Sequence, residues 1–247
     1  MPTILITGAA SGLGAAFLEA YLTHPETTIH ALDRHPIPTT HANIHPHTLD
    51  LTHEPSVNAL STSLSTTPID LLIHSAGIRG LVPALESAHP DSVAAAETLA
   101  GMDAATLART FEINTIATFT LLRAFLPSLL LARDPKAIVM SSRMGSVSLN
   151  APLRPDGTPN PAAGGAYAYR ASKAALNAIV RSFAVDVPGV TFVLCHPGRV
   201  ETGLVRGREE GAIEAGESMR GIVRLIGGWG KGESGGFFDR FGERIEW

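Results

Sequence analysis

The 247-residue sequence has little cysteine, few aromatic residues and no excess of positive charge. Its single cysteine, Cys195, cannot form a disulfide within the chain, which is typical of proteins from reducing compartments. The net charge of −4 provides no basic surface for nucleic acid or for an anionic membrane. No apolar run approaches the roughly 20 residues of a membrane span, and the first residues leave no room for a signal peptide. We therefore expect a cytoplasmic protein that binds neither nucleic acid nor membrane.

Short β-rich apolar segments alternate with longer helix-like ones. Hydrophobic residues make up 45% of the chain, which is enough for a substantial core. The strand-like segments are residues 3–7, 28–33, 43–51, 70–74, 137–141, 190–195 and 236–239. The helix-like segments are residues 13–23, 55–64, 104–132, 169–185 and 217–226. Because the strands lack polar alternation, they predict a parallel sheet covered on both faces, a doubly wound Rossmann-type α/β fold of about seven strands.

Two segments are too long to be simple connections. Residues 79–101 are rich in Ala, Ser and Pro and have room for a small helix, whereas residues 150–165 are rich in Pro and Gly. Long ordered loops in compact domains usually have a function. No break in composition separates a second domain, so we expect one domain over residues 1–247.

A glycine-rich loop joins the first predicted strand to the first predicted helix, where residues 7–14 read T-G-A-A-S-G-L-G. Gly8 allows a tight turn, Gly12 lets the backbone approach a pyrophosphate, and Gly14 lets the helix pack closely on the strand. The helix N-terminus offers amide donors and a positive dipole to phosphate. A glycine-rich turn without a ligand is the alternative, but strand, glycines and helix in register favour a dinucleotide site.

A tyrosine and a lysine stand four residues apart in the segment Y-R-A-S-K, so Tyr169 and Lys173 lie on one helix face. A phenol beside an ammonium group is more acidic than a free phenol and can protonate a carbonyl oxygen or deprotonate an alcohol. The pair Ser141-Ser142 ends the preceding apolar run. Because Y-x-x-x-K arises by chance on many helices, the pair becomes informative only together with the glycine loop.

The combination of T-G-x-x-x-G-x-G with a later Y-x-x-x-K resembles the short-chain dehydrogenase/reductase family, from Thr3 to the C-terminus. Residues 141–146, 166–177 and 234–247 resemble the branch that contains C-factor and sniffer-type carbonyl reductases. The resemblance implies an NAD(P)-dependent oxidoreductase that reduces a carbonyl group, or oxidises the corresponding alcohol, of a small organic substrate. It also implies small substrate-binding elements near residues 149–165 and 202–227. Helices 104–132 and 169–185 are apolar over more than one face, which fits either buried helices or the interface by which this family commonly forms oligomers, so we expect a homodimer or homotetramer.

The resemblance assigns catalysis to four side chains, Asn114, Ser142, Tyr169 and Lys173. The serine would hydrogen-bond the substrate oxygen, and the tyrosine would act as general acid/base. The lysine would lower the tyrosine pKa, hold the nicotinamide ribose and connect to a proton-relay water held by the asparagine. Ser141 is an alternative to Ser142. Tyr167 could compete with Tyr169, but only Tyr169 is four residues from Lys173.

The resemblance also assigns residues to the cofactor. They are Gly8, Ser11, Gly12, Leu13, Gly14, Asp33, Arg34, Asp50, Leu51, Ser75, Ala76, Gly77, Tyr169, Lys173, Pro197, Gly198, Val200 and Thr202. Asp50 and Leu51 match the adenine-binding pair. The chain departs from the family's N-N-A-G turn because His74 and Ser75 replace both asparagines. This change leaves open which side chains make the hydrogen bonds usual in that turn, but it keeps the close backbone approach at Gly77.

Two neighbouring residues favour different nicotinamide cofactors. A carboxylate at Asp33, which ends the second strand, can accept both ribose hydroxyls. It would repel a 2′-phosphate by about 4 kcal/mol per pair of unit charges, at about 4 Å and an effective dielectric near 20. Arg34 follows at once, and in the family a basic residue there often pairs with that phosphate. Ser11 is uncharged, whereas many NADP enzymes of the family have a basic residue at that position. Because Asp33 reaches the ribose first, we favour NAD over NADP.

Other charged groups predict no further site. His45 and His47 share a strand face but have no clustered Cys or carboxylate, so we expect no metal. Arg143 and Arg154 are interpreted as solvated surface charges. Two other functions stay open: a non-redox step on the same scaffold, such as cyclisation or dehydration, and a cofactor-binding signalling protein. A pure binder has no need of the Tyr–Lys pair, which favours an enzyme.

Overall fold

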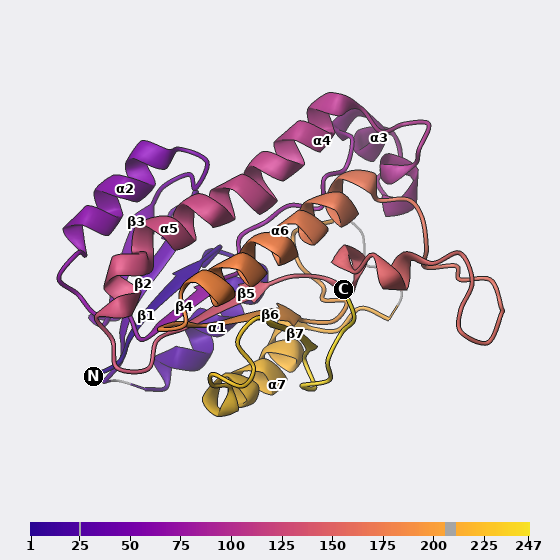
Figure 1. The fold of residues 1–247 in the computed structure, drawn as a ribbon. Helices are drawn as coiled ribbons and strands as arrows, with labels where there is room; N and C mark the ends of the chain where they lie inside the picture. Colours follow the sequence, from indigo (N-terminus) through magenta and orange to yellow (C-terminus); the bar gives the residue numbers. More distant parts are fainter. Residues whose placement is uncertain (25, 206–210) are drawn as a thin grey trace.

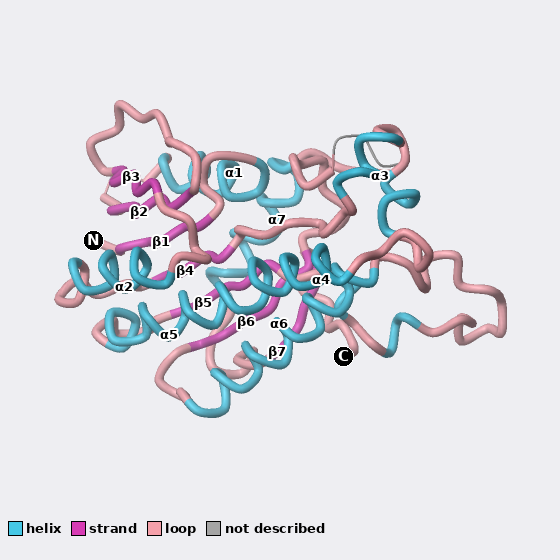
Figure 2. Tube along the Cα trace, turned by 90° about the horizontal axis from the view of Figure 1, so that it is seen from above, coloured by secondary structure: helices cyan, strands magenta, loops and turns pink. Residues whose placement is uncertain are grey.

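A parallel seven-stranded sheet forms the centre of the molecule in the computed structural model, which describes residues 1–24, 26–205 and 211–247 (Figure 1). The strands are β1 Thr3–Thr7, β2 Thr28–Asp33, β3 Ile44–Thr48, β4 Leu71–His74, β5 Lys136–Met140, β6 Thr191–His196 and β7 Gly236–Asp239. Their order is β3-β2-β1-β4-β5-β6-β7, with every neighbouring pair parallel (Figure 2). The chain reverses direction across the sheet between β1 and β4, the kind of switch point at which open α/β sheets bind ligands.

Helices cover both faces of this sheet. They are α1 Gly12–Leu22, α2 Glu54–Ser63, α3 Pro83–Ala88, α4 Ala104–Phe111, α5 Ala117–Leu130, α6 Tyr167–Asp186 and α7 Ala215–Gly228. Helices α1 and α7 lie on one face, and α2, α5 and α6 lie on the other (Figure 1). The prediction of a doubly wound Rossmann-type fold is therefore confirmed. Strand β3 is shorter than predicted because its single neighbour, β2, ends at Asp33, which pairs with Thr48. The edge position also tolerates Pro46, which has no backbone donor.

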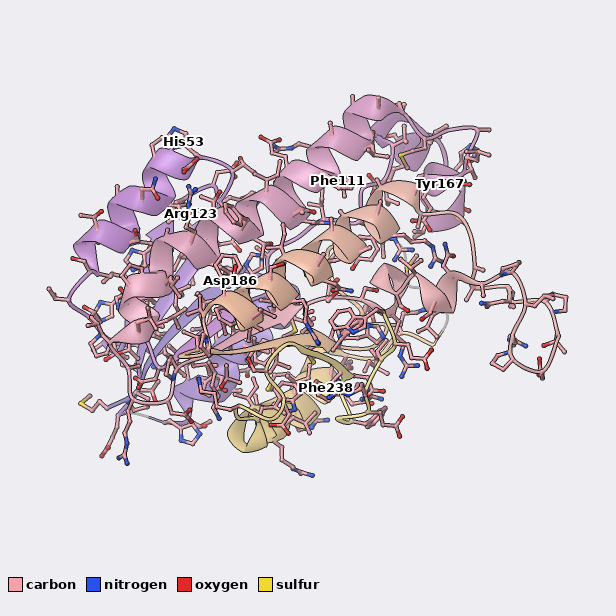
Figure 3. The ribbon with its side chains drawn as sticks, viewed as in Figure 1. His53, Phe111, Arg123, Tyr167, Asp186 and Phe238 are labelled. Atoms are coloured by element: carbon pink, nitrogen blue, oxygen red, sulfur yellow. The ribbon has the colours of Figure 1, made fainter. Side chains whose placement is uncertain are left out.

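Successive side chains of each strand enter two separate cores. In β1, Ile4 and Ile6 face the core with α1 and α7, whereas Leu5 faces the core with α5 and α6. Phe17 fills the first core and Phe125 the second, and both are fully buried. Side chains fill the space between the sheet and both helix layers (Figure 3). Burying a side chain of this kind stabilises the fold by about 1.5–3 kcal/mol, which explains why both strand faces are apolar.

One long helical stretch runs from α4 through a π-helical turn, Glu112–Ile116, into α5. Residues Ala104–Leu130 are long and apolar enough to cross a membrane by length and composition, with a mean hydropathy of 1.4 in the most apolar window. Arg109, Glu112 and Arg123 interrupt the stretch, so it contains no uninterrupted apolar run of the length of a membrane span. Since 56% of that window is buried inside the protein, packing of a core helix accounts for its composition. π-helical turns often occur at functional sites.

The two long segments take different forms. Residues 79–101 hold α3 and a 3₁₀ helix, Val93–Glu97, and reach the start of α6, where the Ala166 amide donates to the Glu97 carbonyl at 2.9 Å. Residues 150–165 have little regular structure beyond a bridge between Leu153 and Pro159, and they project at the right of Figure 1. Both segments therefore meet at the N-terminus of the helix that carries Tyr169.

Candidate active site

Two adjoining cavities of about 390 and 780 Å³ lie where the strands end, and they share lining residues such as Gly77 and Thr202. Predicted cofactor residues that line the smaller cavity are Gly8, Ser11, Gly12, Leu13, Asp33, Arg34, Asp50, Leu51, Ser75, Ala76, Gly77 and Thr202. Those that line the larger one are Leu13, Ser75, Gly77, Tyr169, Lys173, Pro197, Gly198, Val200 and Thr202. Among the predicted cofactor residues only Gly14 lines neither. The pair of cavities suits the two halves of a dinucleotide.

The glycine loop forms a cradle that side chains would fill. Gly8 and Gly12 have φ of +69° and +54°, a region that favours glycine. A Cβ on Gly8 would lie 2.9 Å from the Ala76 amide nitrogen, and one on Gly12 would lie 3.2 Å from the Thr202 side chain. A Cβ on Gly14 would overlap the Gly8 carbonyl, so this glycine serves helix packing. Helix α1 begins at Gly12 without an acidic residue in its first turn, so the cradle and its amides fit a pyrophosphate.

Two carboxylates border the smaller cavity. Asp33 is held against the glycine loop, since its Oδ2 accepts from the Ala10 amide at 3.0 Å and its Oδ1 from the His35 amide at 2.9 Å. Asp50 accepts from the Thr52 amide and hydroxyl at 2.9 and 2.7 Å. The Thr52 hydrogen bonds keep the pKa of Asp50 below its usual range. Both oxygens of Asp33 keep a lone pair for a further donor such as a ribose hydroxyl.

His74 is hydrogen-bonded to two threonine hydroxyls beneath the turn after β4, and one of these hydroxyls holds the turn. The Thr118 hydroxyl donates to the Asn114 carbonyl at 2.8 Å, so it can only accept from His74 Nε2, which lies 2.8 Å away. The Thr7 hydroxyl accepts from the amides of the two residues after His74 and therefore donates to His74 Nδ1 at 2.8 Å. Burial lowers the pKa of His74 to about 3, which keeps the ring neutral. In this turn the Thr7 hydroxyl therefore accepts from the backbone amides, and His74 holds that hydroxyl in place.

Asn114 lies in the π-helical turn, fully buried, and lines neither cavity. Its Oδ1 accepts from the Ile78 amide at 2.8 Å, and its Nδ2 donates to the Ile78 carbonyl at 2.9 Å and to Ser172 Oγ at 3.0 Å. The side chain therefore joins the loop after β4 to helix α6. Its amide group is committed to these contacts, so the water relay stays a prediction.

The two serines after β5 have different partners. Ser141 Oγ donates to Asn177 Oδ1 at 2.6 Å in a buried contact with α6. Ser142 Oγ accepts from the Met144 amide at 3.2 Å, so its own proton is available to a ligand. Both serines contribute to the lining of the larger cavity.

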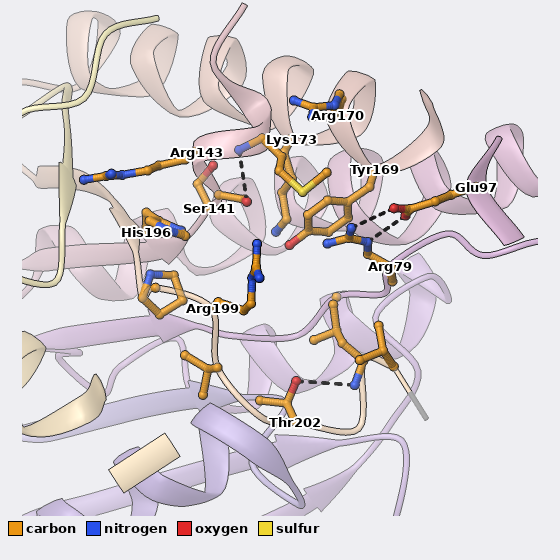
Figure 4. A pocket seen from close by; sticks show the side chains of 18 of the residues that line it. Arg79, Glu97, Ser141, Arg143, Tyr169, Arg170, Lys173, His196, Arg199 and Thr202 are labelled. Carbon is orange, nitrogen blue, oxygen red and sulfur yellow. Dashed lines mark hydrogen bonds and ion pairs between the residues drawn. The ribbon is translucent and has the colours of Figure 1, made fainter. Parts of the chain in front are cut away.

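Tyr169 and Lys173 both line the larger cavity from α6, and both are buried (Figure 4). Lys173 Nζ donates to the Met140 carbonyl at 2.9 Å and lies 5.9 Å from the centre of the Tyr169 ring. Burial lowers the pKa of Lys173 to about 8. Tyr167 is 38% exposed and is not part of this lining. The larger cavity therefore contains a phenol and an amine side by side, groups able to exchange protons with a ligand.

Sequence reasoning missed several cationic residues of this cavity. Arg79, Arg170 and Arg199 line it together with His196. Arg79 stands two residues after Gly77, and its guanidinium lies against the Tyr169 ring (Figure 4). Its place directly after the predicted cofactor turn was the one signal that could have drawn attention to it. Burial lowers the pKa of His196 to about 4, so this imidazole is neutral.

Both arginines predicted as surface charges are exposed, but Arg143 also has a buried partner. Its side chain is 51% exposed, and its Nη2 lies 2.7 Å from Oδ2 of Asp239, a carboxylate only 4% exposed at the end of β7. A buried carboxylate needs a counter-charge, and this arginine supplies it. Arg154 is exposed, as expected. His45 and His47 do share a strand face, where both stack on His30.

Only part of each predicted substrate-binding element lines the larger cavity. Residues 161–165 of the first element line the larger cavity, as do Leu204 and Val205 of the second, 202–227. Residues 206–210 of that second element lie outside the described part of the chain. Within the described ranges, no group of three or more His, Cys, Asp or Glu is arranged to hold a metal ion.

Comparison with known proteins agrees with this geometry. Residues 2–154 match the family model for short chain dehydrogenases. The chain is 37% identical over 193 residues to C-signal of Myxococcus xanthus, covering 77% of this chain and 100% of the relative. It is similar to the solved carbonyl reductase Sniffer of D. melanogaster (TM-score 0.81, 27% identity, 100% of both chains covered). It is also similar to the NADPH-bound carbonyl reductase from chicken fatty liver (TM-score 0.81, 26% identity, 100% of this chain and 99% of that one). The chain therefore belongs to the short-chain dehydrogenase/reductase family, as a nicotinamide-dependent oxidoreductase of the C-factor and sniffer type.

Proposed function

We propose that this protein reduces the carbonyl group of a small organic molecule, or oxidises the corresponding alcohol, with Tyr169 as general acid/base. The observation that carries the proposal is the meeting of Tyr169 and Lys173 in one cavity that adjoins the glycine cradle. The family match and the two carbonyl reductase structures support the same reaction.

The side chains of this protein bind the substrate oxygen and exchange a proton with it. A bound nicotinamide cofactor supplies the hydride that the carbonyl carbon receives. The Ser142 hydroxyl donates to the substrate oxygen and orients it, and Tyr169 gives that oxygen its proton. The Lys173 ammonium favours the phenolate that remains. In alcohol oxidation the phenolate takes the proton back. Asn114 keeps the loop after β4 and helix α6 in register through its three hydrogen bonds.

We propose NAD rather than NADP as the cofactor. The support is Asp33, whose carboxylate is fixed at the rim of the smaller cavity by two backbone amides and would repel a 2′-phosphate. The bound NADPH of the chicken enzyme favours the other choice. Fluorescence titration decides between them: tighter NADH binding, lost in Asp33→Asn, supports NAD, whereas much tighter NADPH binding by the wild type overturns the proposal.

Substrate choice is proposed to depend on the loop at residues 149–165 and on the segment after Thr202. Residues 161–165, Leu204 and Val205 line the cavity that contains Tyr169, which supports this assignment. Shortening the projecting part of the loop should change the ranking of a carbonyl panel by kcat/KM. An unchanged ranking would count against a role in specificity.

We also propose a cytoplasmic homodimer or homotetramer. Ile116, Phe119 and Val185 are exposed on the outer surface of the long helices, and covering them would bury apolar area. The sole cysteine, Cys195, is a buried free thiol, which suits a reducing compartment. Light scattering during size exclusion tests the assembly, where a monomer contradicts it, and cell fractionation tests the location.

The reaction is tested by following reduced nicotinamide with the wild-type protein, NADH or NADPH, and a carbonyl panel. We expect cofactor oxidation that depends on the carbonyl compound. Turnover of a substrate without net cofactor consumption would instead support the non-redox alternative. Cofactor binding without any turnover would support the signalling alternative, which the carbonyl reductase structures do not favour.

A further inference from the structure

A largely buried ion pair holds an arginine beside the proposed general acid. Arg79 Nε lies 2.9 Å from Glu97 Oε2, and Arg79 Nη2 lies 2.9 Å from Glu97 Oε1. The two side chains are only 13% and 11% exposed. A bidentate arginine–carboxylate pair is fixed in orientation, and its charges are weakly screened when water is largely excluded.

This pair faces the ring of Tyr169. The Arg79 Cζ lies 4.9 Å from the ring centre, within the distance of about 6 Å at which a cation and an aromatic face attract each other. Lys173 Nζ lies 5.9 Å from the same centre. In Figure 4, Arg79 lies against Tyr169 while dashed lines join it to Glu97. The phenol therefore has two cations against it, one of which has its own carboxylate partner.

The pair is also anchored to the start of the helix that carries Tyr169. The Glu97 carbonyl accepts from the Ala166 amide at 2.9 Å, directly before α6. Ala166 has φ of +48°, the only positive φ at a non-glycine residue in the described ranges. Backbone in this region is costly for alanine, so surrounding contacts must hold it. Residues 79–101, unexplained by the sequence, thus contact Tyr169 through one side chain and its helix through one carbonyl.

We propose that Arg79 and Glu97 act as a positioning pair for Tyr169, in which Arg79 orients the ring and favours the phenolate while Glu97 limits that effect. The inference rests on the proposed function, because only there does Tyr169 transfer a proton. Apart from this pair, the charged or titratable groups that line the cavity around Tyr169 are Lys173, Arg170, Arg143, His196 and Arg199. Arg79 and Glu97 should then have opposite effects on the ionisation of the Tyr169 phenol.

Titration of Tyr169 tests this without a known substrate. The ultraviolet absorbance of tyrosinate is followed against pH in the full-length protein, and the curve of the matching Tyr169→Phe protein is subtracted for each variant. The subtraction removes Tyr21 and Tyr167, which every variant contains. The variants are Arg79→Gln, Arg79→Lys, Glu97→Gln and the double Arg79→Gln/Glu97→Gln, in which two amides can still pair.

Arg79→Gln should raise the ionisation midpoint of Tyr169 by about one to two pH units, the effect of a unit charge about 6–8 Å away at an effective dielectric near 20. Glu97→Gln should lower it, and Arg79→Lys should stay close to the wild type. If Arg79→Gln does not fold, the double variant must still show a smaller rise. Shifts of the same sign for Arg79→Gln and Glu97→Gln, or no shift in the double variant, overturn the inference. A wild type without carbonyl reduction would refute the proposed function and leave these shifts unchanged.

Discussion

Replacing His74 by glutamine should make the folded protein less sensitive to acid. Glutamine keeps one acceptor and one donor for the hydroxyls of Thr7 and Thr118 but does not titrate. In the wild type both ring nitrogens are committed, Nδ1 as acceptor and Nε2 as donor, and the ring is fully buried. Protonation would place a second N–H where the Thr7 hydroxyl already donates, so the folded protein resists it.

The magnitude follows from the two pKa values of His74. The folded value is about 3 against 6.5 for a free histidine, so the unfolded chain binds the proton first as pH falls. The contribution of His74 to stability is therefore present above pH 6.5 and is lost as the pH falls from 6.5 towards about 3. At 1.36 kcal/mol per unit, about 2 kcal/mol is lost on going from about pH 7.5 to about pH 5.

Urea unfolding at these two pH values measures the effect. The unfolding free energy of the wild type should fall by about 2 kcal/mol more than that of His74→Gln. Both proteins contain His30 and His196, whose pKa values burial lowers to about 4, so each loses further stability and only the difference between them reports His74. His41→Gln, at an exposed position, is the control and should behave as the wild type. An equal fall in wild type and His74→Gln would refute the hydrogen-bond assignment.

Four further substitutions test stability, catalysis and cofactor binding separately. Ser141→Ala should cost about 1–3 kcal/mol of unfolding free energy, because Asn177 Oδ1 loses its buried donor, and should keep activity per folded molecule. Ser142→Ala should instead reduce kcat by about 10²–10³ with little change in urea midpoint; the reverse pattern would exchange the two assignments. Lys173→Met should abolish turnover yet raise the unfolding free energy by up to about 3 kcal/mol, a gain present below pH 8 and lost as pH rises towards 10.5; unchanged stability at pH 7 would contradict the burial argument. Gly8→Ala, at φ of +69° and facing Ala76, should weaken cofactor binding at least tenfold by fluorescence titration, and normal affinity would show that the loop does not cradle the cofactor.

The parts of this molecule that sequence predicts are those fixed by local pattern. The glycine loop is recognisable because turn, strand end and helix start lie within a few residues, and the alternation of strands and helices predicts the Rossmann-type fold. Element ends shifted by a few residues where hydrogen bonding decides, as at β3.

The parts that sequence could not predict depend on partners distant along the chain. The ion pair of Arg143 is not predictable because its partner, Asp239, is 96 residues away. Arg79 and Glu97 are 18 residues apart in an irregular segment, where no periodicity indicates which side chains meet. Likewise, the role of His74 depends on a threonine 67 residues before it.

The central claim is that Tyr169 exchanges the proton during nicotinamide-dependent carbonyl reduction. The most direct measurement compares carbonyl-dependent oxidation of reduced nicotinamide by the wild type, Tyr169→Phe and the matched control Tyr167→Phe, with cofactor affinity measured for each. We predict that Tyr169→Phe lowers kcat by about 10²–10⁴ with cofactor still bound, while Tyr167→Phe keeps the wild-type rate. Full activity in Tyr169→Phe, or equal losses in both variants, would contradict the assignment of Tyr169 as the acid/base.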